Sequence, residues 1–215
     1  PLSEYANIRA SGLRAVLVNE GDNLLSVRLT HGQGHIFIGT NRGMAIRFPE
    51  DEVRPMGRVS AGVRGINLKD GDFVEEVAVI DADDLGEILV VTDQGFGKRT
   101  PISEFRLQRR GGYGITLARL TDKNGKVSAI RHVTEDDEIL VVTEKGMLIR
   151  MSVAEIRRSG RATQGVRVIR LDEDDRVVSV ALAEPAEGGS EGDGNDDSGA
   201  PIPDGEVDDA DAPDA

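Results

Sequence analysis

The chain has 215 residues, with 26 Lys and Arg against 39 Asp and Glu, a formal net charge of −13 and no cysteine. The absence of cysteine excludes disulfides and cysteine-based metal sites, and it suits a reducing cytosol. The longest uninterrupted aliphatic runs, Ile88–Val91 and Ile139–Val142, have four residues; they are far shorter than a membrane-spanning helix, and the opening residues lack the pattern of a signal peptide.

The first 34 residues look like the second half of a repeat. Pro1–Tyr5 matches Pro101–Phe105, and Ser11–Arg14 matches Ala61–Arg64. Both matching segments lie in the middle of a longer unit. We therefore expect residues 1–34 to be a partial blade and the natural gene product to extend before Pro1.

Three full repeats follow, at residues 35–86, 87–137 and 138–184. The segment Glu87–Asp93 (EILVVTD) recurs as Glu138–Glu144 (EILVVTE), and more loosely as His35–Asn41 (HIFIGTN). A turn glycine follows each copy, at Gly43, Gly95 and Gly146. Self-similarity at a fixed period predicts an architecture of repeated structural units.

The last repeat shows the expected strands most clearly. Aliphatic or alternating segments occur at Glu138–Thr143, Met147–Met151, Gly165–Leu171 and Arg176–Ala183. Lys145-Gly146 and Asp172–Asp175 are expected to turn, and Ser152–Ile156 could form one helical turn. Four short β segments per roughly 50 residues are typical of a propeller blade. We predict an all-β, propeller-like fold of repeated four-stranded blades, with a core of Val, Ile and Leu.

One loop per repeat ends in a glycine and carries arginines at fixed places. The closing glycines Gly12, Gly62, Gly114 and Gly165 are spaced by 50, 52 and 51 residues. A glutamate precedes the loop glycine by ten residues, at Glu52, Glu104 and Glu155. Arginines lie two and six residues after each glutamate and two after most loop glycines: Arg54, Arg58, Arg64, Arg106, Arg110, Arg157, Arg161 and Arg167. Stacked or radial units would line these groups into one basic stripe.

The stretch Gln108–Gly114 (QRRGGYG) is the richest copy of this loop. Arg109 and Arg110 offer planar forks of donors suited to phosphate oxygens, and glycines let the backbone approach a ligand with its own N–H groups. The chemistry on offer is anion binding. A solvated Gly-rich turn is the alternative for a single run, and the recurrence of the loop favours the binding interpretation.

Charge also divides by position within the repeats. The first parts (35–67, 87–119, 138–170) hold 18 basic and 9 acidic residues, and the second parts (68–86, 120–137, 171–184) hold 5 and 16. In a blade architecture this division gives one positive rim and one negative surface. The body, 1–184, carries only −2 overall, yet it is expected to bind a polyanion on one side.

The final segment, 185–215, accounts for most of the net charge. It has 11 Asp and Glu, no Lys or Arg, and almost no large apolar residues. Such a segment cannot bury enough surface to offset chain entropy, so we expect a disordered acidic tail. Tethered near the basic stripe, it is expected either to compete with a bound polyanion or to act only as a solubilising tail.

Several kinds of active site are excluded by spacing. Gly97-Lys98 lacks the earlier glycine and the Ser/Thr of a phosphate-binding loop. His31 and His35 have no third ligand nearby, and the Asp/Glu runs lack calcium-loop spacing. No nucleophile–base–acid set is visible, so we expect no catalytic residue, no metal site and no cofactor in this chain.

The QRRGGYG run resembles the signature box of the C-terminal domain of the DNA gyrase A protein. Gly95–Thr100, Thr163–Val166 and Gly62–Ile66 also look like that domain's repeats. The resemblance covers residues 1–184. It implies a β-pinwheel, usually of six blades, that wraps double-stranded DNA around a basic rim. In the bacterial cytoplasm the rest of the gyrase A protein joins the gyrase B protein in a heterotetramer. That enzyme is a type II topoisomerase that binds ATP and Mg²⁺ elsewhere and introduces negative supercoils.

Two features depart from the family pattern. Tyr113 stands where the box usually has Lys or Arg, and the run lies in the penultimate blade rather than the first. Gln108–Gly114 is then either the functional box itself or a relative of a functional box that lies before Pro1. The topoisomerase IV protein with the same pinwheel is a close alternative. A propeller-type scaffold that binds an acidic protein partner is another.

The resemblance and the phasing together give a set of expected DNA-binding residues. Tyr113 is expected not to be a DNA-cleaving nucleophile, because glycines flank it and no metal-binding carboxylates are near. The expected DNA-binding residues are Arg54, Arg58, Arg64, Arg106, Gln108, Arg109, Arg110, Gly111, Gly112, Gly114, Arg157, Arg161 and Arg167.

Overall fold

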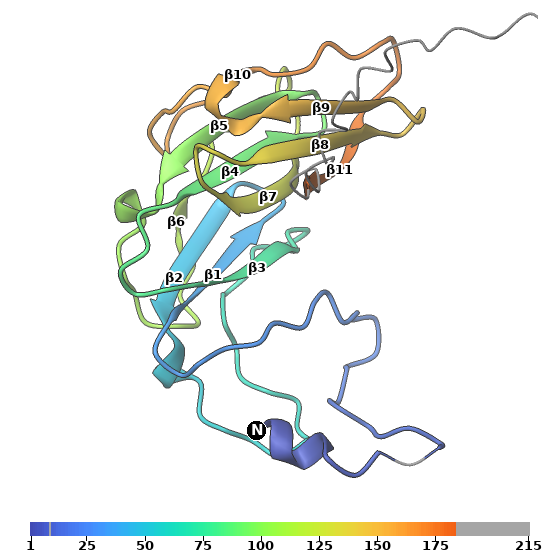
Figure 1. Cartoon of the computed structure of the whole chain (residues 1–215), viewed down its shortest axis with the longest axis vertical. Helices are drawn as coiled ribbons and strands as arrows, with labels where there is room; N and C mark the ends of the chain where they lie inside the picture. Colours follow the sequence, from blue (N-terminus) through green and yellow to red (C-terminus); the bar gives the residue numbers. More distant parts are fainter. Residues whose placement is uncertain (9, 184–215) are drawn as a thin grey trace, which may run out of the picture. The chain divides into compact units, whose positions relative to one another are not determined.

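A computed structural model describes residues 1–8 and 10–183 (Figure 1). The acidic segment 185–215, with its predicted disorder and competitor role, lies outside the described residues. Within the described residues the chain forms strands and 3₁₀ turns and no α-helix, which confirms the all-β prediction.

The strands fall into three antiparallel sheets (Figure 1). The first has the order β3-β1-β2-β6, the second β10-β5-β4-β7 and the third β11-β8-β9. The strands are β1 (His35–Thr40), β2 (Met44–Pro49), β3 (Val74–Ile80), β4 (Glu87–Thr92), β5 (Phe96–Pro101), β6 (Ile115–Thr116), β7 (Val127–Val133), β8 (Glu138–Thr143), β9 (Leu148–Ser152), β10 (Val166–Arg167) and β11 (Val177–Leu182). The 3₁₀ turns are η1 (Leu2–Tyr5), η2 (Glu50–Glu52), η3 (Ile102–Glu104) and η4 (Val153–Glu155).

The strands of the last repeat follow the sequence prediction closely. β8, β9 and β11 lie where aliphatic or alternating segments were expected, and η4 is the expected helical turn. The predicted strand Gly165–Leu171 is the exception. It is reduced to β10, two residues long, and β10 does not join the sheet of its own repeat.

Each short loop strand completes the sheet of the preceding repeat. β6 pairs antiparallel with β2, with Ala45 opposite Ile115, and β10 pairs with β5, with Gly97 opposite Val166. A four-stranded sheet in space therefore contains three strands of one repeat and one strand of the next. The sequence repeat and the four-stranded sheet are therefore offset by one strand. Alternation along Gly165–Leu171 predicts a strand without specifying its partner.

The loop glycines permit this exchange. Gly114 has φ +75°, and a Cβ built there would lie 2.3 Å from the carbonyl oxygen of Ala45. Gly165 has φ +78°, and its Cβ would lie 2.5 Å from the carbonyl oxygen of Gly97. Only glycine combines the left-handed conformation with so close a backbone approach.

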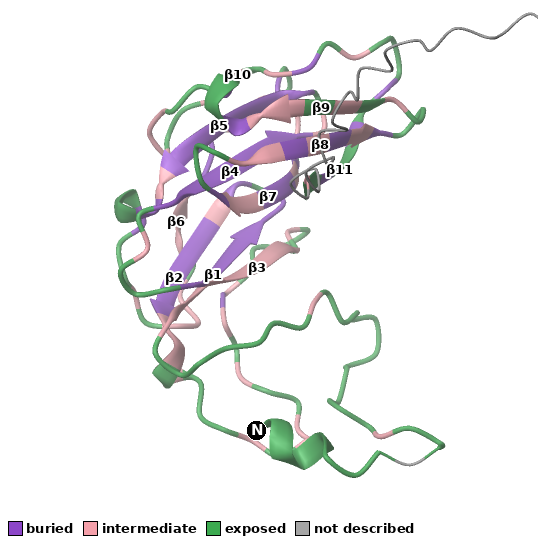
Figure 2. Cartoon of the chain, viewed as in Figure 1, coloured by how far each residue is buried: buried purple, intermediate pink, exposed green. Residues whose placement is uncertain are grey.

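Two of the three core clusters in the described residues lie between successive sheets (Figure 2), and the third, formed by Ile38, Ile46, Phe48 and Ile66, lies within one repeat. One cluster joins side chains of β1 to those of β4 and β7, and a second joins β4 and β7 to β8 and β11. Val, Ile and Leu make up most of both clusters, as predicted. Phe37 and Phe105, from consecutive repeats, pack edge to face with centroids 5.1 Å apart, so aromatic contacts also join the repeats.

The described residues before β1 contain the 3₁₀ turn η1 and no strand (Figure 1). Residues 24–30 occupy the position of β3 in the repeat, but no described strand lies beside them, and Val27 and Leu29 are 76% and 71% exposed. Val63–Arg64, at the position of β6, is likewise not a strand. A strand sequence alone does not form a strand without a neighbour to pair with.

Gly114→Ala is expected to destabilise the fold far more than Gly62→Ala. Both glycines have a positive φ, +75° and +79°, but nothing lies within 4 Å of a Cβ at Gly62. The control substitution therefore costs only left-handed strain, about 1–2 kcal/mol. Gly114→Ala must in addition push β6 away from β2. Denaturant unfolding followed by circular dichroism would measure both, and equal losses would contradict the close-approach explanation.

Candidate nucleic-acid interface

The loops with phased arginines run along the outer edges of the sheets. The N–H of Gln108 donates to the carbonyl oxygen of Arg47 at 2.9 Å, and the N–H of Ser159 donates to that of Arg99 at 2.9 Å. Each loop therefore lies against the outer strand, β2 or β5, of the preceding repeat before it pairs there as β6 or β10. The strand exchange thus brings loops from successive repeats to equivalent edges.

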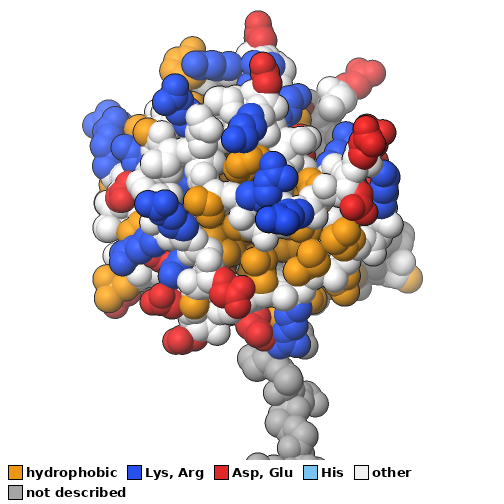
Figure 3. All heavy atoms as spheres, turned by 90° about the horizontal axis from the view of Figure 1, so that it is seen from above, with side chains coloured by type: hydrophobic (Ala, Val, Ile, Leu, Met, Phe, Trp, Pro, Cys, Tyr) orange, Lys and Arg blue, Asp and Glu red, His pale blue; other side chains and the backbone are white. Residues whose placement is uncertain are grey.

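Six of the predicted arginines are exposed and have no hydrogen bond or ion pair from their side chains to any described residue. Arg167 lies over the Phe96 ring, with Cζ 5.2 Å from the centroid. Figure 3 views the molecule from the side on which β9 and β10 lie, and Lys and Arg side chains are spread over this face. The exposed arginines are Arg54, Arg64, Arg106, Arg109, Arg157 and Arg167.

The other three predicted arginines are half-buried and bind backbone. Arg58 Nη1 donates to the carbonyl oxygen of Arg14 at 3.3 Å. Arg110 Nη1 donates to that of Arg64 at 3.1 Å, and Arg161 Nη1 to that of Thr116 at 2.9 Å. These acceptors all lie two residues after the preceding loop glycine.

The phased glutamates also reach the next repeat. Glu52 Oε2 accepts the N–H of Arg110 at 2.9 Å, and Glu104 Oε2 accepts that of Arg161 at 3.2 Å. Arg110 Nε donates in return to the Glu52 carbonyl oxygen at 3.1 Å. The recurrence of glutamate in the sequence therefore reflects a contact between repeats.

The rest of the box-like run also serves the contact between repeats. The N–H of Gly111 donates to the carbonyl oxygen of Gly65 at 2.5 Å, and the carbonyl oxygen of Gly112 accepts the N–H of Asn67 at 2.8 Å. The backbone N–H of Gly111, expected to face an anion, is thus already used. Gln108 Nε2 is buried and lacks a partner among the described residues. Tyr113 is 57% exposed.

Sequence reasoning missed three buried cations beneath these loops: Lys98, Arg99 and Arg47, whose Nη1 donates to the carbonyl oxygen of Ile102 at 3.2 Å. Lys98, only 1% exposed, donates from Nζ to the carbonyl oxygens of Gly160 and Arg161 at 2.8 and 2.5 Å. Burial lowers the pKa of Lys98 to about 8, and the nearby Arg161 charge acts in the same direction. At the equivalent positions the other repeats have Ile46 and Ile149. A lysine where the period expects an apolar residue was the available signal.

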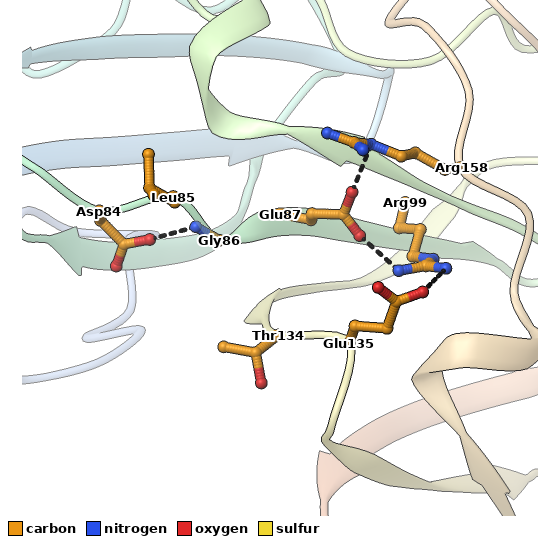
Figure 4. Close-up of a pocket in the computed structure, with 8 residues that line it drawn as sticks. All are labelled: Asp84, Leu85, Gly86, Glu87, Arg99, Thr134, Glu135 and Arg158. Atoms are coloured by element: carbon orange, nitrogen blue, oxygen red, sulfur yellow. Dashed lines mark hydrogen bonds and ion pairs between the residues drawn. The ribbon is translucent and has the colours of Figure 1, made fainter.

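Arg99 is the second buried cation, in a pocket where charges from two repeats meet (Figure 4). Its guanidinium lies 2.9 Å from Glu87 and 2.9 Å from Glu135, and Arg158 reaches the other oxygen of Glu87 at 2.8 Å. Burial lowers the pKa of Arg99, but the hydrogen bonds that its guanidinium donates to the two carboxylates outweigh burial and raise the pKa overall. The buried pair Arg99 and Glu87 joins the repeats through Arg158, and the Arg99 guanidinium is not open to an anion.

Other kinds of site are lacking in the described part of the chain. It contains no group of three His, Cys, Asp or Glu side chains placed to hold a metal ion. No helix in residues 1–8 or 10–183 is long and apolar enough to cross a membrane. What the arrangement offers chemically is a set of exposed guanidinium groups on phased, mutually bonded loops.

The family model described as DNA gyrase C-terminal domain, beta-propeller, matches residues 1–31, 34–81, 86–134 and 137–184. The chain belongs to this family. The DNA gyrase A protein of Staphylococcus aureus strain MRSA252 is 47% identical over 180 residues, covering 84% of this chain and 20% of that protein. The same figures hold for the protein of strain NCTC 8325 / PS 47. The gyrase C-terminal domain described here thus spans about a fifth of the curated relatives that it matches.

Solved structures of related domains share the fold. The C-terminal domain of DNA topoisomerase IV superposes with a TM-score of 0.80 at 32% identity, covering 85% of this chain and 57% of that one. A DNA gyrase A C-terminal domain gives 0.73 at 29% identity, covering 80% and 58%. The Escherichia coli ParC C-terminal domain, at 16% identity and 0.57, covers 79% and 70% and agrees in fold alone.

Lys98→Met is expected to change how stability depends on pH. The pKa of Lys98 falls from 10.5 to about 8 on folding, so between these values the unfolded state binds more protons. The unfolding free energy of the wild type should therefore rise with pH, relative to Lys98→Met, across that window. Denaturant titrations of both proteins at pH values below and within the window would test this, and parallel pH profiles would contradict it.

Proposed function

We propose that this chain is a noncatalytic DNA-binding module of the DNA gyrase A protein that bends duplex DNA along its phased loops. The observation that carries the proposal is the set of six exposed arginines whose side chains make no hydrogen bond or ion pair with a described residue, placed on equivalent loops of successive repeats. Guanidinium groups on a repeating scaffold suit the repeating phosphates of a duplex. Contacts of this kind position DNA without reading its sequence.

Bending requires contributions from several repeats. Bending 20–30 base pairs through 40–90° costs about 1–6 kcal/mol, more than one exposed ion pair returns. Loops bonded to one another along the sheet edges would present their charges together. In this proposal the bound duplex follows the exposed arginines from Arg54 through Arg106 and Arg109 to Arg157 and Arg167.

The wider setting is proposed from the family. The rest of the gyrase A protein would join the gyrase B protein to form the complete bacterial enzyme, an ATP-dependent type II topoisomerase. ATP and Mg²⁺ would be bound outside this chain, and wrapping of DNA here would let the complete enzyme introduce negative supercoils in the cytoplasm, at the nucleoid. The similarity to the DNA gyrase A proteins of S. aureus supports this setting.

A topoisomerase IV domain is the second candidate. It is favoured by the TM-score of 0.80 to a topoisomerase IV domain, against 0.73 to the gyrase domain. The two candidates share a DNA-binding role for this chain. Supercoiling of relaxed plasmid by the complete enzyme distinguishes them, since the proposed gyrase must introduce negative supercoils.

Charge removal at the exposed arginines is expected to weaken DNA binding in a salt-dependent way. Each phosphate interaction removed, as in Arg109→Gln or Arg157→Gln, should lower the magnitude of the slope of log affinity against log salt by about 0.9. Arg176→Gln is the matched control, because Arg176 lies in an acidic second part and is already paired with Glu144 at 2.7 Å. Fluorescence anisotropy with one duplex at several salt concentrations measures the slopes.

Equal decreases for Arg109→Gln and Arg176→Gln would place the binding surface elsewhere. Absence of salt-dependent binding to any duplex, with retained binding to an acidic protein, would favour the scaffold alternative.

Tyr113→Phe is expected to have no effect in assays of DNA cleavage, because we expect the wild-type chain to form no covalent adduct with DNA. The tyrosine is exposed, and the described residues hold no metal-binding group to assist transesterification. Denaturing gels of the isolated chain with labelled DNA measure covalent adducts. An adduct formed by the wild type and absent from Tyr113→Phe would overturn this expectation.

A further inference from the structure

Arg110 and Arg161 share two contacts with the repeat before them. In each case a glutamate of that repeat accepts the arginine's own N–H, and the guanidinium donates to the backbone two residues after the preceding loop glycine. We call Glu52 with Arg110, and Glu104 with Arg161, the interrepeat latches. Their recurrence at 2.9–3.2 Å in both pairs of complete repeats makes a chance contact a poor explanation.

The first latch fixes a segment that carries an exposed arginine, and the second fixes the loop strand β6. Arg110 binds the carbonyl oxygen of Arg64, whose own guanidinium is exposed. Arg161 binds that of Thr116, within β6. The neighbouring Arg109 is exposed and has no such bond among the described residues. Adjacent arginines of the same loop therefore occupy different environments.

We propose that Arg110 and Arg161 are positioning residues, which set the angle between successive loops and hence the bend of bound DNA rather than its affinity. This rests on the proposed function for the bend, while the latch itself is a property of the chain without DNA. Hydrogen bonds from one planar guanidinium restrain both distance and orientation. A lysine, with its rotating ammonium group, keeps the charge without that restraint.

The first arm of the test uses the full chain without DNA. Amide hydrogen exchange should show protection at Arg110, bonded to Glu52, and at Gly111, bonded to Gly65 at 2.5 Å. Arg110→Lys should lose protection at both amides, whereas the matched control Arg109→Lys should retain it. Unchanged protection in Arg110→Lys would overturn the latch.

The second arm uses a short duplex labelled at both ends for energy transfer. At saturation, Arg110→Lys should bend the duplex less than the wild type with the same salt slope, because its charge is kept. Arg109→Lys should change neither quantity. If Arg110→Gln lowers the slope by as much as Arg109→Gln, about 0.9, Arg110 binds phosphate and the proposal is wrong.

Glu104→Ala tests the second latch without altering an arginine. This variant still tests the proposal if Arg110→Lys does not fold. Removing a negative charge beside the loops should tighten DNA binding. Charge alone therefore predicts an equal or larger bend, whereas loss of the latch predicts a smaller one. Failure of the wild type to bind any duplex would overturn the proposed function, and the hydrogen-exchange arm would still decide the latch.

Discussion

The close approach of each loop glycine to the backbone of the preceding outer strand constrains the whole arrangement. Gly114 and Gly165 bring the chain so near to β2 and β5 that no side chain fits between them. The loop strands can then pair there, and the glutamate and arginine of neighbouring repeats come within bonding distance. The fourth strand of each four-stranded sheet depends on this one approach.

The parts of the fold that depend on local pattern could be predicted from the sequence. β8, β9, β11 and η4 follow from aliphatic runs, alternation and turn glycines within a single repeat. The partner of β10 could not be predicted in this way, because pairing with β5 is a tertiary choice made by a segment of two residues. Residues 24–30 also show that local sequence does not decide pairing. They have the sequence of a strand, but they form none because no described strand lies beside them.

The sequence predicted which residues make up the candidate site, but not which of its arginines are exposed and which are bonded to another repeat. The QRRGGYG run predicted the same role for Arg109 and Arg110, yet Arg109 is exposed and Arg110 donates to the carbonyl oxygens of Glu52 and Arg64. Nothing in one sequence separates two adjacent arginines, because the difference lies in carbonyl groups contributed by another repeat. Counting basic residues likewise includes Arg99, which is buried against Glu87 and adds nothing to the outer surface. Surface charge is therefore smaller than composition suggests and is set by which guanidinium groups lack internal acceptors.

Strand exchange also has a consequence for the order in which the protein is made. The first sheet starts with β1 and β2, but its last strand, β6, begins only at Ile115. At roughly 5–20 residues per second, the stretch from the end of β2 to β6 takes about 3–13 seconds to synthesise. During that interval the outer edge of β2 has its backbone groups unpaired, the condition under which strands associate with other chains. Each repeat leaving the ribosome thus depends on the next to cover it.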